Sequence, residues 1–156
     1  MELDLHEIRL LYSEAAKDDL KGQRLYKLLE KDQTKLSPTF TAYWGAALAM
    51  QAKNTLNVFS KLYYIQKANE HFAKAVKLEP ENVEIRFLRF SIQLNTPAFL
   101  GYSQHIDLDK TQIMKHLESD SVDLEMRLAI ADFLLKSGKC TAKETDYLKL
   151  FISAKL

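Results

Sequence analysis

The sequence predicts an all-α protein, and three observations point that way. Ala, Leu, Lys, Glu and Gln are abundant, and these residues favour helix. The 156 residues include only three Pro and four Gly, so few positions interrupt a helix. No segment shows the alternation of apolar and polar residues that a half-buried strand requires. We expect a single domain over residues 1–156, because this length suits one core.

Apolar periodicity and capping signals place about eight helices along the chain. The predicted helices span, in order, about 3–16, 18–32, 38–53, 61–78, 82–94, 108–118, 121–137 and 141–156. The first two follow from apolar residues at helical spacing. Ser37 before Pro38 predicts the start of the third. This helix has apolar or small residues on nearly every face, so we expect it to be buried, with close approach of a neighbour at Gly45.

The later helices are marked by chain breakers and caps. Pro80 ends the fourth helix, and the fifth opens at Asn82. An irregular loop at 95–106 follows, in which we expect the apolar side chains of residues 99 and 100 to pack down as plugs. Gly138 closes the helix predicted at 121–137. Thr141 and Glu144 have the spacing of a capping box, which opens the last helix.

The segment ANEHFAKAVKLEP (68–80) resembles a known repeat. Ala68, Phe72, Ala75 and Pro80 are spaced by four, three and five residues, as in the second helix of a tetratricopeptide repeat. The resemblance implies antiparallel helix pairs stacked as a short tetratricopeptide-like α-α superhelix, with Phe72 filling the space between paired helices. The segment 86–103 is also similar to parts of uncharacterised bacterial repeat proteins, some of them exported.

The helix at 82–94 carries the most information about a site. On a helical wheel it has two apolar strips, so we expect it to be sandwiched between neighbouring helices. Two polar edges separate the strips. One edge holds Glu84 and Ser91, and the other holds Asn82, Arg86, Arg89 and Gln93.

The arginine edge has two interpretations. Arg86 and Arg89 have no acidic residue three or four positions away in their own helix, so their charges must be matched elsewhere. In the resembled family, the first helix of each pair lines a concave groove, and basic side chains there hold a peptide carboxylate. The resemblance therefore implies a polar stripe of Asn82, Arg86, Arg89 and Gln93 that binds a partner. Alternatively, both arginines pair with acids on adjacent helices and only hold the stack together.

Aromatic residues complete the predicted partner-binding set. Tyr63 and Tyr64 are adjacent and point about 100° apart on a helix, so at least one is expected to be exposed. Tyr102 is expected near the mouth of the groove. The segment HIDLD offers His105, Asp107 and Asp109 as candidate metal ligands. A cap of the following helix by one of the two aspartates is the favoured interpretation, so we predict no metal and no cofactor.

These features predict a non-catalytic module that binds a protein or peptide in a concave helical groove, where a carboxylate of the partner could be held. The alternative is a self-associating scaffold without a peptide groove. No pattern of catalytic residues predicts an enzyme. The net charge of +1 argues against nucleic acid, and the longest uncharged run, at 36–52, is too short for membrane insertion. The first residues lack the basic and apolar regions of a signal peptide, so we expect a cytoplasmic protein, or an exported one whose signal peptide has been removed.

Overall fold

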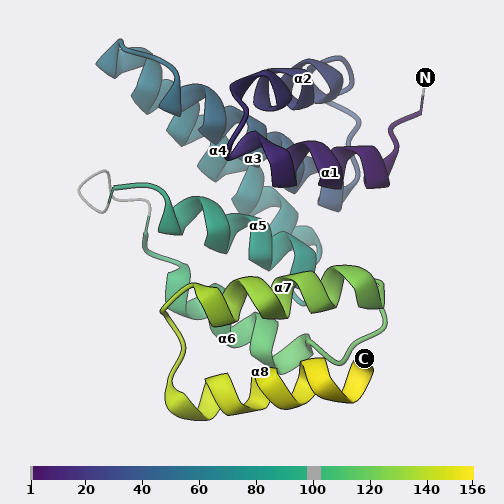
Figure 1. Cartoon of the computed structure of the whole chain (residues 1–156). Helices are drawn as coiled ribbons and strands as arrows, with labels where there is room; N and C mark the ends of the chain where they lie inside the picture. The colour runs from purple at the N-terminus through teal and green to yellow at the C-terminus, as the bar shows by residue number, and fades with distance from the viewer. Residues whose placement is uncertain (1, 98–102) are drawn as a thin grey trace.

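The computed structural model describes residues 2–97 and 103–156, and Figure 1 shows their arrangement. Within these residues the chain forms eight α-helices and no strand, which confirms the all-α prediction. The helices are α1 (Leu5–Ala15), α2 (Asp19–Glu30), α3 (Pro38–Lys53), α4 (Val58–Leu78), α5 (Val83–Leu94), α6 (Ile106–His116), α7 (Leu124–Lys136) and α8 (Ala142–Lys155). No helix in this described part is both long and apolar enough to span a bilayer.

The helices form consecutive antiparallel pairs, and the pairs stack. α1 packs against α2, α3 against α4, α5 against α6 and α7 against α8. The first helix of one pair contacts the first helix of the next, since α3 packs on α5 and α5 on α7. In Figure 1, α1, α5 and α7 accordingly lie one below another. The stacked helix pairs that the sequence predicts are therefore present.

Local capping signals set several helix ends where they were predicted. The Ser37 hydroxyl accepts a hydrogen bond from the backbone N–H three residues on, and Pro38 is the first residue of α3. Thr141 and Glu144 make both hydrogen bonds of the capping box at the start of α8. Gly138, with φ of 73°, adopts the left-handed conformation just after α7.

Two other predicted starts are wrong. α4 begins at Val58 and not at about 61, because the Asn57 side chain accepts hydrogen bonds from the N–H groups two and three residues on. α7 begins at Leu124 and not at 121, because the Asp123 carboxylate caps the helix there. In both cases the cap is a polar residue, Asn57 or Asp123, that lies outside any apolar periodicity.

α3 and α4 approach each other closely at Gly45, as predicted. A Cβ atom at this position would lie 3.1 Å from the carbonyl oxygen of Ala68 and 3.4 Å from the ring of Phe72. The Phe72 side chain is buried in the space between the two helices. The small residues at these positions therefore allow the tight contact on which the α3–α4 pair depends.

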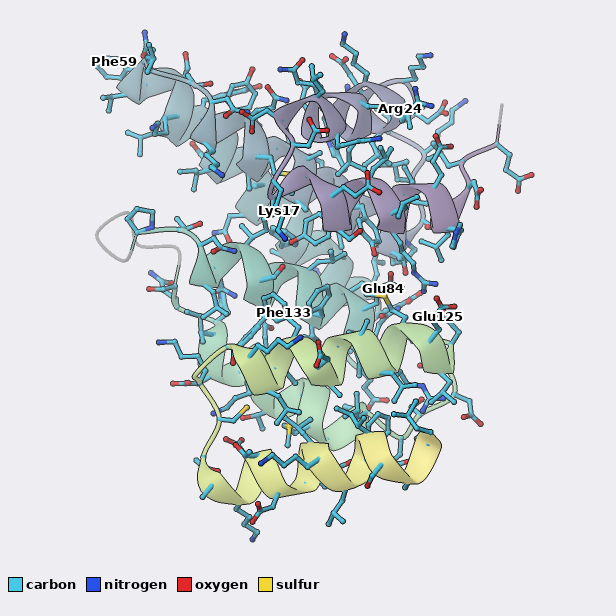
Figure 2. All side chains as sticks on the ribbon, in the orientation of Figure 1. Lys17, Arg24, Phe59, Glu84, Glu125 and Phe133 are labelled. Carbon is cyan, nitrogen blue, oxygen red and sulfur yellow. The ribbon has the colours of Figure 1, made fainter. Side chains whose placement is uncertain are left out.

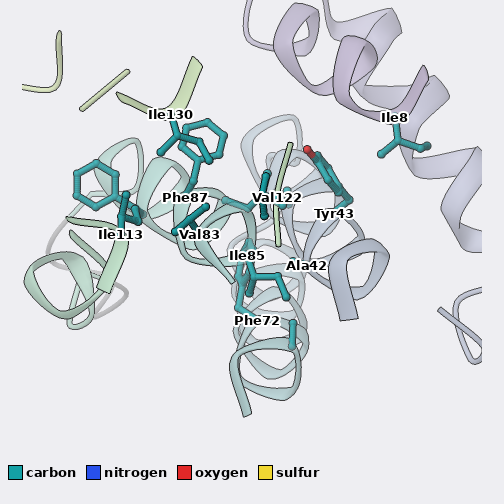
Figure 3. Close-up of a cluster of buried hydrophobic side chains, with 14 of the residues drawn as sticks. Ile8, Ala42, Tyr43, Phe72, Val83, Ile85, Phe87, Ile113, Val122 and Ile130 are labelled. Atoms are coloured by element: carbon teal, nitrogen blue, oxygen red, sulfur yellow. The ribbon is translucent and has the colours of Figure 1, made fainter. Parts of the chain in front are cut away.

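The buried apolar side chains form one continuous cluster that draws on all eight described helices. Figure 3 shows part of it, with Val83, Ile85 and Phe87 of α5 at its centre. Ten of the twelve residues of α5 are buried, because α3, α4, α6 and α7 all pack on this helix. The expectation that α5 is sandwiched is confirmed. Its two polar edges are buried as well, and they organise the site.

Candidate functional site

A cleft of about 1160 Å³ lies on the face formed by the first helices of the pairs. Its walls are mostly apolar, with Leu10 from α1, Ile92 from α5, and Met126 and Phe133 from α7. The last turn of α3 and the first half of α4 line the end at the upper left of Figure 1. Figure 2 shows Phe133 of α7 directed toward α5, where its ring packs edge-to-face against Phe87 and Phe90. The stacking of the pairs therefore produces a concave surface.

Beneath the floor of this cleft lies a buried carboxylate that three helices share, and its partners Arg9 and Tyr43 line the cleft. Arg9 of α1 donates from Nε and Nη2 to the two oxygens of Glu84 on α5, each at 2.8 Å. The Tyr43 hydroxyl of α3 donates to Glu84 Oε2 at 2.6 Å. Arg9 also reaches Asp123 at the start of α7, with 2.8 Å between Nη1 and Oδ1. Glu84 is 2% exposed, and this bidentate pairing matches its buried charge.

The two phenols and the guanidinium at the floor keep their protons near neutral pH. Burial, and then the neighbouring Glu84 carboxylate, raise the pKa of the Tyr43 phenol well above its ordinary value. Burial likewise raises the pKa of Tyr12 to about 12, although its hydrogen bond with Ser91 acts in the opposite direction. The hydrogen bond to Glu84 raises the pKa of Arg9. Both phenols therefore stay protonated, and the Tyr43 hydroxyl remains a donor to Glu84.

The residues of the predicted polar edge do not form an open stripe. Asn82 caps α5, accepting hydrogen bonds from two backbone N–H groups at its start. Arg86, Arg89 and Gln93 are 6%, 5% and 5% exposed. Arg86 donates to Asp109 of α6 at 3.0 Å, Arg89 donates twice at 2.8 and 2.7 Å, and Gln93 donates at 2.9 Å. The edge therefore faces α6.

These contacts favour the second interpretation of the arginines, in which they pair with an acid on an adjacent helix. Asp109 is 0% exposed, and the donors of α5 surround both of its oxygens. Arg86 is held further by the Pro80 carbonyl at 2.9 Å, and Gln93 accepts from the His105 backbone N–H at 2.7 Å. Arg89 and Gln93 also line the cleft. A partner carboxylate would nevertheless have to displace Asp109 to reach either arginine.

The role of Asp109 was missed in the sequence. The expected cap by Asp107 or Asp109 is wrong, because His105 precedes α6 and no side chain makes a capping hydrogen bond there. A signal existed, since Asp109 follows Ile106 by three residues and precedes Ile113 by four. That spacing places the aspartate on the apolar, inward face of its helix.

Tyr63 and Tyr64 do not line the cleft. Tyr63 is 56% exposed and Tyr64 is half-buried against the core, with their rings 5.7 Å apart in an edge-to-face arrangement. One of the two is therefore exposed, as expected. The cleft is lined by a different face of α4. Tyr102 and the expected plugs at residues 99 and 100 lie outside the described residues.

An exposed apolar surface lies beside the cleft, at the turn between α3 and α4. We call it the apolar tip; it consists of Leu56, Val58, Phe59, Leu62 and Tyr63. Leu56 is 99% exposed and Phe59 is 83% exposed. Leu56 and Val58 also line the cleft, so the two surfaces are continuous. Figure 2 shows Phe59 projecting from the far end of α4. Of these residues only Tyr63 was predicted to contact a partner, because Val58 and Phe59 precede the helix start predicted at about 61.

The comparisons with known proteins add no further constraint. The chain gives no match to protein-family models, to curated proteins or to solved structures. Among the described residues, no group of three or more His, Cys, Asp or Glu side chains is placed to hold a metal ion. Function must therefore be inferred from the cleft and the apolar tip.

Proposed function

We propose that the chain is a non-catalytic module that binds a protein or peptide in its concave cleft. The observation that carries this proposal is the cleft itself, with its mostly apolar walls on the first helices of successive pairs. Its volume of about 1160 Å³ exceeds the range of roughly 300–1,000 Å³ that is usual for small-molecule pockets. A groove of this kind suits a segment of polypeptide, whose apolar side chains it would bury.

The resemblance to tetratricopeptide repeats supports the same proposal. The first helices α1 and α3 begin at residues 5 and 38, which are 33 residues apart, close to the repeat length of about 34. The next first helices begin at residues 83 and 124, at wider spacings. The wider spacing before α5 follows from the 21 residues of α4. We propose a tetratricopeptide-like array on this basis, with α4 extended.

The proposal is tested by selecting binders from a library of displayed random peptides. A selected peptide is then titrated against Ala129→Arg, which places a large side chain in the cleft from an exposed position on α7. Ala154→Arg on the exposed side of α8 is the matched control. We expect at least about tenfold weaker binding for Ala129→Arg and no loss of binding for the control. Both variants should stay folded, since Arg and Ala have similar helix propensity. Equal binding by both variants, or no enriched peptide, would contradict the proposal.

Self-association through an end of the array has less support. The end helices α2 and α8 expose apolar side chains singly, such as Leu20 and Leu150, and isolated residues of this kind are normal on a surface. Self-association predicts a mass that rises with protein concentration in light scattering. A constant monomer mass would leave the cleft as the functional surface.

A further inference from the structure

We infer that the cleft takes an acidic, apolar segment of another protein, with its carboxylates at the end next to the apolar tip. This inference rests on the proposed function and adds the chemistry of the partner. It combines three features of one region: apolar side chains that are exposed, a helix end that holds them in place, and lysines without a matching acid.

The apolar tip is an ordered surface. Asn57 accepts hydrogen bonds from the N–H groups of Phe59 and Ser60 at 2.8 and 3.2 Å, which fixes the first turn of α4. On the other side of the turn, the Thr55 hydroxyl donates to the Gln51 carbonyl of α3 at 2.8 Å. The exposed side chains are therefore presented by a capped helix, and binding would cost little ordering.

The tip is exposed because α4 is longer than its neighbours. With about 1.5 Å of rise per residue, the 21 residues of α4 are longer than the 16 of α3 and the 12 of α5, and Figure 1 shows the start of α4 projecting beyond the other helices. Five large apolar side chains are exposed within eight residues of the chain, and such a concentration usually marks an interaction site. The partner surface that covers this tip must therefore be apolar.

The lysines at this end of the cleft determine the charge of the partner. Lys53 ends α3 and Lys61 lies in the first turns of α4, and both line the cleft. Neither makes an ion pair with any described residue, and the residues outside the described ranges contain no acid. Asp19 is the acidic residue that lines the cleft nearby, so positive charge is in excess.

The remaining cations of the cleft are already matched. Arg9 is paired with Glu84 and Asp123, and Arg89 is paired with Asp109. At the opposite end the cleft is lined by Glu125, which Figure 2 shows far from Phe59. The unmatched charge thus changes sign along the cleft. Complementarity places the acidic end of a bound segment at Lys53 and Lys61, and keeps it away from Glu125.

Other acidic or anionic partners fit less well. An anionic membrane would contact the tip but not the walls of the cleft, which are concave. Nucleic acid requires many phosphate contacts, whereas two lysines and a net charge of +1 supply few. A polypeptide segment is the partner that uses the apolar cleft, the apolar tip and the lysines together.

The test is the composition of peptides selected by the wild-type protein, followed by titration of one of them. We expect enrichment of Asp and Glu together with apolar residues.

In the titration, Lys53→Glu/Lys61→Glu should weaken binding of such a peptide by about tenfold or more, since like charges then face each other. The matched control, Lys27→Glu/Lys31→Glu, makes the same charge change at exposed positions of α2 and its end and should bind within about twofold of wild type. A peptide with its acids changed to Lys should bind the first variant better than wild type.

The other outcomes separate this inference from the proposed function. Enriched peptides without acidic residues, or equal binding by the two charge variants, would overturn the inference. The proposed function would stand in that case, provided that Ala129→Arg still blocks binding. No enrichment of any peptide would overturn both. Binding to vesicles of phosphatidylserine and phosphatidylcholine without peptide binding would replace the inference with a membrane contact.

Discussion

Buried charged side chains link the helices, and each has its partners in place. Glu84 is matched by Arg9, and Asp109 is matched by Arg86 and Arg89. Arg127 donates to the backbone carbonyls of Val122 and Leu117 at 2.8 and 3.2 Å, which holds the turn between α6 and α7. A buried charge that loses its partner costs far more than the pair contributes. Single substitutions in these clusters should therefore have large effects.

The first prediction concerns the cluster around Asp109. Arg89→Ala should lower the free energy of unfolding by about 3–5 kcal/mol, because it removes two of the hydrogen bonds to a fully buried carboxylate. Lys136→Ala, in the exposed pair with Asp132, should cost less than about 1 kcal/mol. Urea unfolding followed by the fluorescence of the single tryptophan, Trp44, measures both.

A double-mutant cycle identifies the cause. Asp109→Ala combined with Arg89→Ala should be less destabilising than the sum of the two single variants, because the second substitution removes a charge that the first leaves unpaired. If Arg86→Ala/Arg89→Ala is as stable as wild type and binds a selected peptide less well, the arginines face the partner and the pairing with Asp109 is unimportant.

The second prediction concerns pH and His71. Burial, and then Lys74, lower the pKa of this imidazole below its ordinary value of 6.5. As the pH falls through 6.5, the unfolded chain takes up a proton that the folded chain takes up only at lower pH. Stability is therefore lost on acidification in this range. His71→Gln should flatten the dependence of the unfolding midpoint between about pH 7 and about pH 5.

His105 provides an internal comparison for that measurement. Its pKa is also lowered, by burial and then by Arg89. Adding His105→Gln to His71→Gln should flatten the pH dependence further. An unchanged slope in both variants would mean that the imidazoles titrate alike in the folded and unfolded chains.

At the scale of elements, local signals in the sequence predicted the helices well. Ser37–Pro38 and the Thr141–Glu144 box act within four residues, so their effect is visible in the sequence. The start of α4 was missed because its first apolar residues are exposed and therefore follow no inward periodicity. The site depends on contacts between distant residues, such as the Arg9–Glu84 pair, which are 75 residues apart. No local pattern specifies such a pair, so the residues that line and support the cleft could not be predicted from the sequence.

The third prediction tests the close packing of α3 on α4. Gly45→Ala should destabilise the protein by about 1–3 kcal/mol, because the new Cβ would lie 3.1 Å from the Ala68 carbonyl oxygen. Gly22→Ala in α2 is the matched control. Its Cβ would meet only Ala15 and Met50 at 3.7 and 3.8 Å, which are ordinary contacts. This variant should gain about 0.5–1 kcal/mol from the higher helix propensity of alanine.

Thermal and urea unfolding of the two variants give the answer. The opposite signs matter, because both changes add the same methyl group to a helix. If Gly45→Ala stabilises the protein as Gly22→Ala does, then α3 and α4 are farther apart than the structure shows.

At the scale of the whole molecule, Arg9 connects the first pair of helices to the rest of the array across the cleft. Its guanidinium reaches α5 through Glu84 and the start of α7 through Asp123. α1 otherwise packs mainly on α2, with less contact to α3. Arg9 therefore joins α1 to two later helices at the end of the cleft opposite the apolar tip, in addition to the Tyr12–Ser91 hydrogen bond and the packing of α2 on α3.

The fourth prediction follows from that position. Arg9→Ala should lower the free energy of unfolding by about 3–5 kcal/mol, because Glu84 stays buried with Tyr43 as its remaining side-chain partner. Arg24→Ala is the control, since the Arg24–Glu7 pair also involves α1 but is exposed, and its loss should cost at most about 1 kcal/mol.

Hydrogen exchange of Arg9→Ala should be faster in α1 and α2 than in α5 to α7, as expected when one pair separates before the others. Arg9→Lys should recover only part of the loss, because an ammonium group cannot make the bidentate contact. Equal stability and uniform exchange in Arg9→Ala would show that apolar packing alone holds α1 in place, and that the width of the cleft is set by the core.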